Sequence, residues 1–170
     1  NPPRNTVSIG KGMTLGKFTA TPEGESVSVK NLHFKTEITR GSIFRAITGS
    51  GSLADISDIG LYDSKNALIS KGETDATGII FKDIFTIAST TNYTIRATLG
   101  SRFKQNQTIT FSTDFKDGVT FTDVSSNKPV SAPTLPLTLS KMMVGTVSPS
   151  DENIGTPPTR QPKQVQKQGS

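Results

Sequence analysis

Apolar and polar residues alternate along most of this chain with a period of two. The clearest example is residues 91–100, TNYTIRATLG, whose apolar positions are Tyr93, Ile95, Ala97 and Leu99. Successive side chains of a β-strand point to opposite faces of a sheet, so this stretch predicts a strand with one buried face and one solvated face.

Comparable stretches recur at short intervals, separated by turn residues. Strands are expected at residues 13–20, 27–38, 53–62, 67–70, 79–87, 91–99, 109–115, 119–121 and 135–139. The apolar phase shifts near Gly16, and it slips again at Asn31, where we expect a β-bulge. No segment combines capping residues with an apolar stripe of period 3.6. The pattern predicts an all-β sandwich or barrel, and we favour an antiparallel β-sandwich, Ig-like or jelly-roll-like, with extended terminal segments.

This pattern divides the chain into an extended N-terminal segment at 1–12, a β-sandwich domain at 13–147 and a C-terminal tail at 148–170. The tail is rich in Pro, Gln and Lys and has too little apolar surface to order itself alone. Two terminal segments, 5–15 and 134–147, alternate like strands. Their apolar positions are Val7, Ile9, Met13, Leu15, Leu135, Leu137, Leu139, Met143 and Val147.

The composition indicates a lean core and a soluble surface. Only 32% of the 170 residues are hydrophobic and the mean hydropathy is -0.32, which suits antiparallel sheets with one face in water. The net charge of +5 comes from basic residues spread along the chain rather than gathered in a patch, so no nucleic-acid partner is expected. No apolar run approaches the roughly 18 residues that a membrane span needs.

Reactive side chains are scarce. The chain has no Cys and one histidine, His33, which alternation between Leu32 and Phe34 places on the solvated face of its strand. A nucleophile, a histidine base and an orienting acid cannot be assembled from this set, so we expect no catalytic residues and no enzymatic activity. A zinc site is disfavoured for the same reason, and no cofactor is expected.

Two groups of aspartates lie close together in the sequence. They are Asp55, Asp58 and Asp63 in one group, and Asp114, Asp117 and Asp123 in the other. Aspartates at strand ends are commonly turn formers, which is the interpretation that we favour. The alternative is a calcium site, because Ca²⁺ takes oxygen ligands from carboxylates, carbonyls and water. The spacing matches no EF-hand loop.

The sequence gives only weak indications of glycan binding or glycosylation. A carbohydrate-binding sandwich usually presents aromatic rings, and this chain has no Trp and only two tyrosines, Tyr62 and Tyr93. Asn92 and Asn106 each begin an Asn-X-Thr pattern and are candidates for N-glycosylation. Because that pattern is short, it arises often by chance.

Four stretches together resemble a known type of module. They are GKFTATPEGESVSVKNLHFKTEIT, ADISDIGLYDSKNALIS, GIIFKDIFTIASTTNYTIRATLG and QTITF. Over about residues 14–112 the chain resembles the Ig-like β-sandwich modules of surface and S-layer-type proteins from uncultured bacteria of the candidate phyla. Residues 59–63 match the Leu-Tyr-Asp strand of those modules, and residues 87–99 match the segment that follows it. The resemblance implies an extracellular structural role.

The favoured hypothesis is therefore a structural subunit of an extracellular or cell-surface assembly: a filament, a pilus-like fibre or a surface layer. Its partners would be copies of itself, joined by β-strand addition or edge pairing through a terminal segment. The alternative for each segment is that it completes its own sandwich. A single module with a strand-like extension and a long tail favours a small self-assembling subunit over a multidomain S-layer protein.

Two other functions stay open at this point. The first is a viral or phage structural protein, a capsid, decoration or tail subunit, in which the basic tail residues Arg160, Lys163 and Lys167 would meet nucleic acid. The second is a non-catalytic module that binds a cell-surface glycan or the cell wall. It requires exposed aromatic rings or a Ca²⁺ site.

Overall fold

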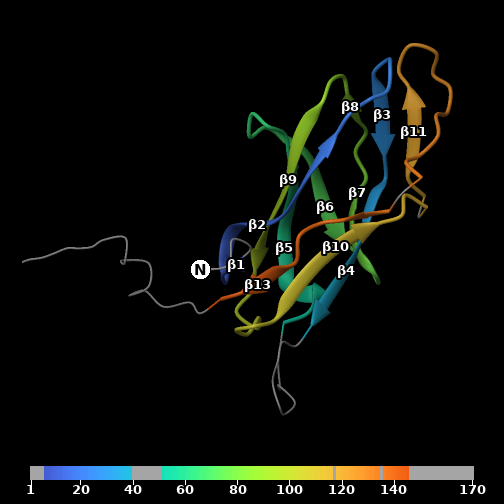
Figure 1. Cartoon of the computed structure of the whole chain (residues 1–170). Helices are drawn as coiled ribbons and strands as arrows, with labels where there is room; N and C mark the ends of the chain where they lie inside the picture. Colours follow the sequence, from blue (N-terminus) through green and yellow to red (C-terminus); the bar gives the residue numbers. More distant parts are fainter. Residues whose placement is uncertain (1–5, 40–50, 117, 135, 146–170) are drawn as a thin grey trace, which may run out of the picture.

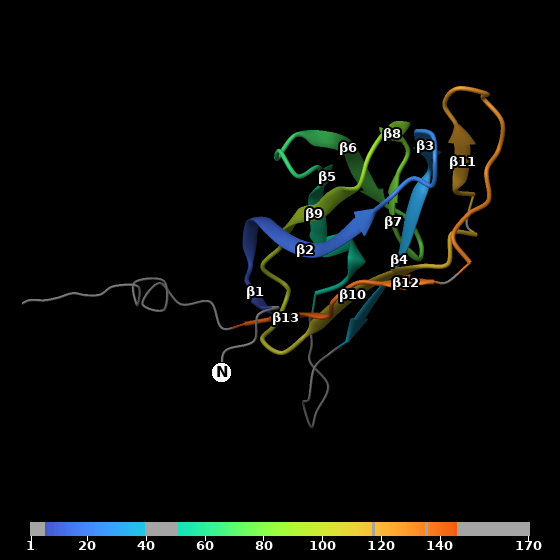
Figure 2. The same ribbon diagram turned by 45° about the horizontal axis from the view of Figure 1, so that its top comes forward.

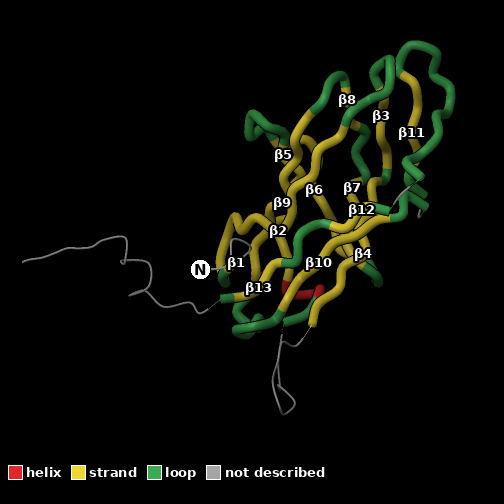
Figure 3. The backbone as a smooth tube through the Cα atoms, viewed as in Figure 1, coloured by secondary structure: helices red, strands yellow, loops and turns green. Residues whose placement is uncertain are grey.

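The part of the chain that the structure describes is almost entirely β-strand and loop. The computed structural model describes residues 6–39, 51–116, 118–134 and 136–145. Within them the one helical element is a short 3₁₀ turn, Leu53–Asp55, drawn in red in Figure 3, and no α-helix occurs. The prediction of an all-β chain is confirmed.

Ten strands form one continuous hydrogen-bonded sheet (Figure 1). Their order is β1-β13-β10-β4-β7-β6-β5-β9-β2, and β12 also pairs with β10. The strands are β1 (Thr6–Val7), β2 (Gly10–Ala20), β4 (Leu32–Thr39), β5 (Ile56–Tyr62), β6 (Leu68–Thr74), β7 (Gly78–Phe81), β9 (Thr91–Leu99), β10 (Thr108–Thr113), β12 (Leu137–Thr138) and β13 (Met142–Val144).

This sheet curls back toward itself. Its two terminal strands, β1 and β2, are separated in the sequence only by Ser8 and Ile9. Figure 2 shows β2, β9 and β5 in one layer and β13, β10 and β4 in the other, and β6 and β7 link the two layers. The result is a barrel-like or sandwich arrangement whose interior is filled by side chains.

A second sheet of three strands stands at one end of the molecule, at the top of Figure 1. Its order is β11 (Thr120–Asp123), β3 (Val27–Lys30) and β8 (Phe85–Ile87). Only Asn31, with a φ of 61°, separates β3 from β4 of the large sheet. A residue in this left-handed conformation breaks a strand, and Asn tolerates it.

The structure therefore corrects several predicted strand boundaries. The single bulged strand expected at 27–38 is two strands in different sheets, and the strand expected at 79–87 is divided in the same way into β7 and β8. The strand expected at 53–62 begins with the 3₁₀ turn, and β6 continues to Thr74. The predicted shift near Gly16 is confirmed, because the β2–β9 register changes between Thr14 and Gly16.

The core is organised around Phe34, whose side chain is fully buried. Its ring centroid lies 5.7 Å from that of Phe18, 6.5 Å from that of Phe81 and 6.4 Å from that of Phe111. Phe34 thus joins side chains from β2, β4, β7 and β10. The inner face of β9 is buried from Tyr93 to Leu99, as the alternation in residues 91–100 predicted.

Candidate functional site: the seam of the terminal strands

The two predicted self-association segments lie side by side in the structure. β1, near the N-terminus, pairs in parallel with β13, near the C-terminus, with Thr6 opposite Met143 and Val7 opposite Val144. Every other strand pair among the described residues is antiparallel. Nothing in the local sequence indicated that these two segments are neighbours.

β12 and β13 attach this end of the chain to the edge of β10. β13 runs antiparallel to β10, with Thr108 opposite Met143, and β12 pairs further along, with Ser112 opposite Thr138. Between them, the N–H of Leu139 donates to the carbonyl oxygen of Phe111 at 2.8 Å. We call β1, β12 and β13, with the edge of β2 that faces them, the seam.

The seam segments bury most of the apolar positions predicted for self-association. Val7, Leu15 and Leu139 belong to the core, and Ile9, Met13 and Leu137 pack against it partly buried. In this structure both segments thus complete the sheet of their own chain, one of the two outcomes expected from the sequence. Leu135 and Val147 lie outside the described residues.

The prediction that Met143 continues the buried face is wrong. Met143 is exposed, whereas its neighbours Met142 and Val144 are core residues. The chain shifts phase at Ser140 and Lys141, between β12 and β13, so the inward positions change from odd to even numbers. All three residues of the run Met142-Met143-Val144 are apolar, so the local sequence does not show which of these side chains face inward.

The outer edge of β2 faces the terminal strands across a groove of about 480 Å³. This edge pairs with no strand of the described chain. The groove is lined by Thr6, Val7, Gly12, Met13, Thr14, Lys17, Ser140 and Met142.

At one point the two sides of the seam are in direct contact. A Cβ on Gly16 would lie 2.5 Å from Leu139 Cδ1, so the Leu139 side chain packs directly against the Gly16 backbone. The boundary predicted between residues 12 and 13 falls inside β2.

Two features of β2 make its edge a poor template for unrelated strands. The strand has register irregularities at two places against β9, and it carries the exposed side chains of Lys11 and Lys17. Bulges and lysines on an edge strand disfavour indiscriminate pairing with other chains. The edge of β11 is covered differently: the N–H of Val130 donates to the carbonyl oxygen of Phe121 at 2.9 Å, so residues near 130 follow that edge.

The prediction that His33 is solvated is wrong. Its side chain is only 5% exposed, and its Nε2 lies 3.0 Å from Asp75 Oδ2 and 3.2 Å from Thr77 Oγ1. The turn between β6 and β7 folds over this outward position of β4, which alternation alone does not reveal. A Ser-His-Asp triad places acid and hydroxyl on different ring nitrogens. Here Asp75 and Thr77 share Nε2, an arrangement that stabilises a turn.

Asp75 is also held by the backbone of that turn. Burial raises the pKa of Asp75, but the backbone N–H groups of Thr77 and Gly78 and the side chain of His33 lower it, and the net pKa is below the usual 3.8. The N–H of Gly78 donates to Asp75 Oδ1 at 2.8 Å. Asp75 therefore fastens the β6–β7 turn to β4.

Where they are described, the aspartates of both predicted groups make turn and loop contacts, except Asp58, which lies within β5 and contacts β9. Asp55 Oδ2 accepts the N–H of Ser52 at 2.8 Å, Asp63 Oδ1 accepts the N–H of Lys65 at 2.9 Å, and Asp123 Oδ2 accepts the hydroxyl of Ser126 at 2.6 Å. Asp114 accepts the N–H of Lys116, and Asp58 accepts the hydroxyl of Thr98. Asp117 lies outside the described residues. No three His, Cys, Asp or Glu side chains in the described part of the chain are placed to hold a metal ion.

The two glycosylation candidates have different surroundings. Asn92 is exposed on the outer face of β9, and its Oδ1 accepts the hydroxyl of Thr19 at 2.5 Å. Asn106 is half-buried with a φ of 74°, and its N–H donates to the carbonyl oxygen of Val144 at 2.7 Å. A glycan on Asn106 would therefore adjoin the seam.

Comparison of the chain with protein-family models, characterised proteins and solved structures finds no match. Within the residues that the structure describes, no helix is both long enough and apolar enough to span a bilayer. The arguments for function consequently rest on the geometry of the chain itself.

Proposed function

We propose that this protein is a structural subunit of an extracellular assembly, a filament, pilus-like fibre or surface layer, whose copies join by exchanging a terminal strand. The domain is proposed to be an Ig-like sandwich, as the resemblance of residues 14–112 implies. The observation that carries the proposal is the seam: terminal strands of two and three residues supply core side chains but are held by short ladders.

The segment at 136–145 is the better candidate for exchange. Leu139, Met142 and Val144 are buried, and each contributes roughly 1.5–3 kcal/mol through burial. An acceptor that lacked this segment would expose the edge of β10 and an apolar strip beside it. A neighbouring copy can restore the same contacts with its own segment, because an exchanged element makes the contacts that it makes within one chain.

The connection before β12 favours this exchange. Residues 131–134 form no strand, and the sequence carries Pro133 and Pro136 on either side of residues 134 and 135. Proline-rich connections are extended and stiff, so they carry a segment away from its own domain more readily than a compact loop does. A heterologous contact of this kind builds an open filament unless its rotation closes the ring.

Disulfide trapping tests the proposal directly, because the chain contains no cysteine. One variant carries Ser112→Cys and a second carries Thr138→Cys, which are partners across β10 and β12. Facing residues of paired strands lie within the Cα separation that a disulfide spans. When the two single variants are mixed and oxidised, we expect disulfide-linked pairs whose formation tracks fibres seen by negative-stain microscopy.

A matched control uses Ser57→Cys and Thr98→Cys, which are partners across the central strands β5 and β9. A mixture of these single variants should stay unlinked, whereas a chain carrying both should form an internal bond. If the Ser112→Cys and Thr138→Cys mixture also stays unlinked at high concentration, and only the chain carrying both substitutions is bridged, strand exchange at this site is excluded.

A further inference from the structure

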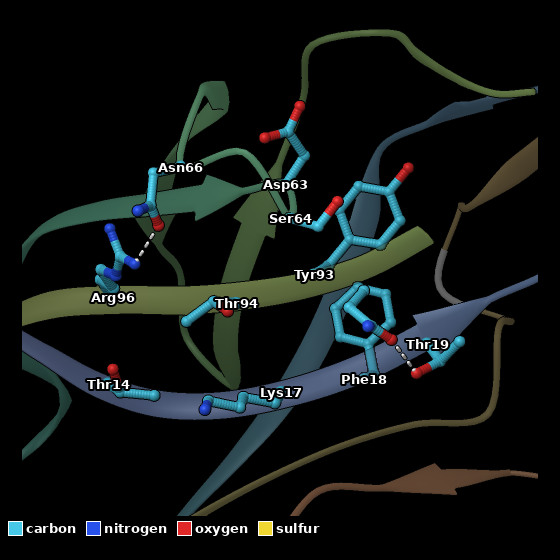
Figure 4. Close-up of a pocket in the computed structure, with 11 residues that line it drawn as sticks. Thr14, Lys17, Phe18, Thr19, Asp63, Ser64, Asn66, Tyr93, Thr94 and Arg96 are labelled. Atoms are coloured by element: carbon cyan, nitrogen blue, oxygen red, sulfur yellow. Dashed lines mark hydrogen bonds between the residues drawn. The ribbon is translucent and has the colours of Figure 1, made fainter. Parts of the chain in front are cut away.

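A second groove lies on the outer face of the sheet (Figure 4) and adjoins the seam groove along β2, where Thr14 and Lys17 line both. It has a volume of about 550 Å³ and is bordered by β2, by β9 and by the turn between β5 and β6. Its polar character comes mainly from Lys17 of β2, Asn92 and Arg96 of β9, and Asp63 and Asn66 of the turn. Residues far apart in the sequence thus meet here.

Arg96 is held in place by two contacts. Its guanidinium carbon lies 4.6 Å from the ring centroid of Tyr62, and its Nη2 donates to Asn66 Oδ1 at 2.6 Å. Asn66 has a φ of 65°, a left-handed conformation that Asn tolerates and that shapes the turn. A guanidinium fixed in this way loses little side-chain freedom when it binds a ligand, and two contacts leave several of its five N–H donors for that ligand.

The hydrogen-bond acceptors of this groove are largely engaged within the protein. Asn66 Oδ1 accepts from Arg96, Asn92 Oδ1 accepts from Thr19, and Asp63 Oδ1 accepts from the N–H groups of Lys65 and Ala67. Because an amide carries its donors on the other terminal atom, the two asparagines offer N–H groups to a ligand. The two asparagines therefore add donors to those of Lys17 and Arg96.

Lys17 adds a second positive charge beside Arg96. On the β2–β9 ladder Lys17 faces Thr94 and Thr14 faces Arg96, which makes the two cations diagonal neighbours on one face. Within the described residues, neither Lys17 nor Arg96 forms an ion pair with a carboxylate. The nearby carboxylate of Asp63 uses Oδ1 to accept the N–H groups of Lys65 and Ala67 in its own turn.

We infer that this groove binds a carboxylate-bearing glycan, such as a chain of uronic acid sugars. A guanidinium matches a carboxylate with two parallel hydrogen bonds, and Lys17 supplies a second charge for the same group or for the next one along the chain. Amide and hydroxyl donors suit the many oxygen atoms of sugar rings. Recognition here would rest on the charge of the sugar, in place of the exposed aromatic rings or Ca²⁺ site that a glycan-binding module was expected to require. An open groove between a strand and a turn accommodates an extended chain better than a compact ligand.

Single-stranded nucleic acid fits this groove less well. Its binding sites usually offer aromatic rings on which bases stack. Of the two rings that line the groove, Tyr93 is buried, and the half-buried Phe18 stacks on it with 5.3 Å between the ring centroids. One face of the nearby Tyr62 ring is covered by Arg96. The groove takes no residue from the terminal strands β1, β12 and β13 that the proposed exchange would move, although Thr14 and Lys17 of β2 also line the seam groove.

Calorimetric titration of the full chain with an oligouronate tests the inference, with a neutral oligoglucan of the same length as the comparison. We expect binding of the oligouronate only. Arg96→Gln and Lys17→Gln should each weaken it about tenfold or more, since each removes a charge-assisted contact. Lys30→Gln makes the same charge change on β3, away from the groove, and should leave the affinity within about twofold.

A third variant distinguishes the loss of ligand binding from the loss of the folded structure. Asn66→Asp keeps a residue that tolerates a positive φ, but it places a carboxylate against Arg96, so binding should be lost while the thermal transition is retained. The inference is overturned if the oligouronate does not bind, or if the groove variants bind like Lys30→Gln. It is also overturned if the neutral glycan, a polyphosphate or a single-stranded oligonucleotide binds as tightly.

Discussion

The centre of the sheet and the seam differ in how they hold their buried residues. β9 runs for nine residues, pairs with β5 on one edge and with β2 on the other, and buries every second side chain. β1, β12 and β13 have two or three residues each and still bury Val7, Met142 and Val144. Apolar burial is thus shared by both regions, whereas backbone pairing is concentrated in one.

This difference bears on how the molecule opens. Segments with short ladders detach locally at a lower free energy than long strands with extended ladders. When the seam opens, it exposes the edge of β10 and the apolar side chains beneath β13, and both are complementary to the segment that has just left. A second copy presents that same segment, which is why the proposed strand exchange would take place at the seam.

The largest expected loss of stability comes from a substitution at the centre of the molecule. Phe34→Ala removes a fully buried ring that touches Phe18, Phe81 and Phe111. It should lower the free energy of unfolding by about 3–5 kcal/mol, because the cavity is walled by several strands that cannot collapse together. Denaturant titration measures the loss. A loss below about 1 kcal/mol would contradict the central role assigned to this ring.

A smaller effect is expected at the seam. Val144→Thr keeps the side-chain shape but buries a hydroxyl, which should cost about 1–3 kcal/mol. Hydrogen exchange should quicken at the amides of Val144 and Gly145, while the amides of β9 keep their protection. Met143→Thr is the matched control: its exposed position should leave stability within about 0.5 kcal/mol. Equal effects of the two substitutions would refute the inward phase of Val144.

The contact between Gly16 and Leu139 sharpens the comparison further. Gly16→Ala should destabilise the chain by roughly 1–2 kcal/mol, because the new methyl group displaces a well-packed leucine. In a Leu139→Ala background the same change should cost much less. A double-mutant cycle measures this coupling, and an additive result would show that the two residues do not meet across the seam.

The smallest expected effect is on how the stability of the fold depends on pH. The pKa of Asp75 is lower in the folded chain than its usual 3.8, so its charged form stabilises the fold above that value, and this contribution is lost as the pH falls through the lower folded pKa. Asp75→Asn should therefore be less stable than the parent chain at neutral pH. The difference should shrink in acid below about pH 3.8. If the difference in stability between Asp75→Asn and the parent chain is constant from pH 7 to about pH 2.5, the role of Asp75 does not depend on its charge.

Much of the fold follows from local pattern. The strict alternation in residues 91–99 predicted the buried face of β9, and the phase shift near Gly16 predicted the irregularity in β2. These features are readable because a strand alternates its side chains with a period of two whatever it pairs with. The apolar character of the terminal segments was likewise visible, and most of those positions do pack against the core.

Other features depended on what came to lie next to a segment. Asn31 reads equally well as a bulge or as a break between sheets, and only the neighbours of β3 and β4 decide which it is. His33 is buried because a turn more than 40 residues away covers it. The choice between Met142 and Met143 was undecided by sequence, since both are apolar.

The sequence by itself determined that the chain is made of strands, because alternation is a property of each segment alone. Only the tertiary structure decided that β1 meets β13, and that Lys17, Asn66 and Arg96 share one groove. Both are contacts between distant segments, and they depend on strand order and register. Strand order and register are set by burying all the apolar faces together, and no single stretch of the sequence contains that information.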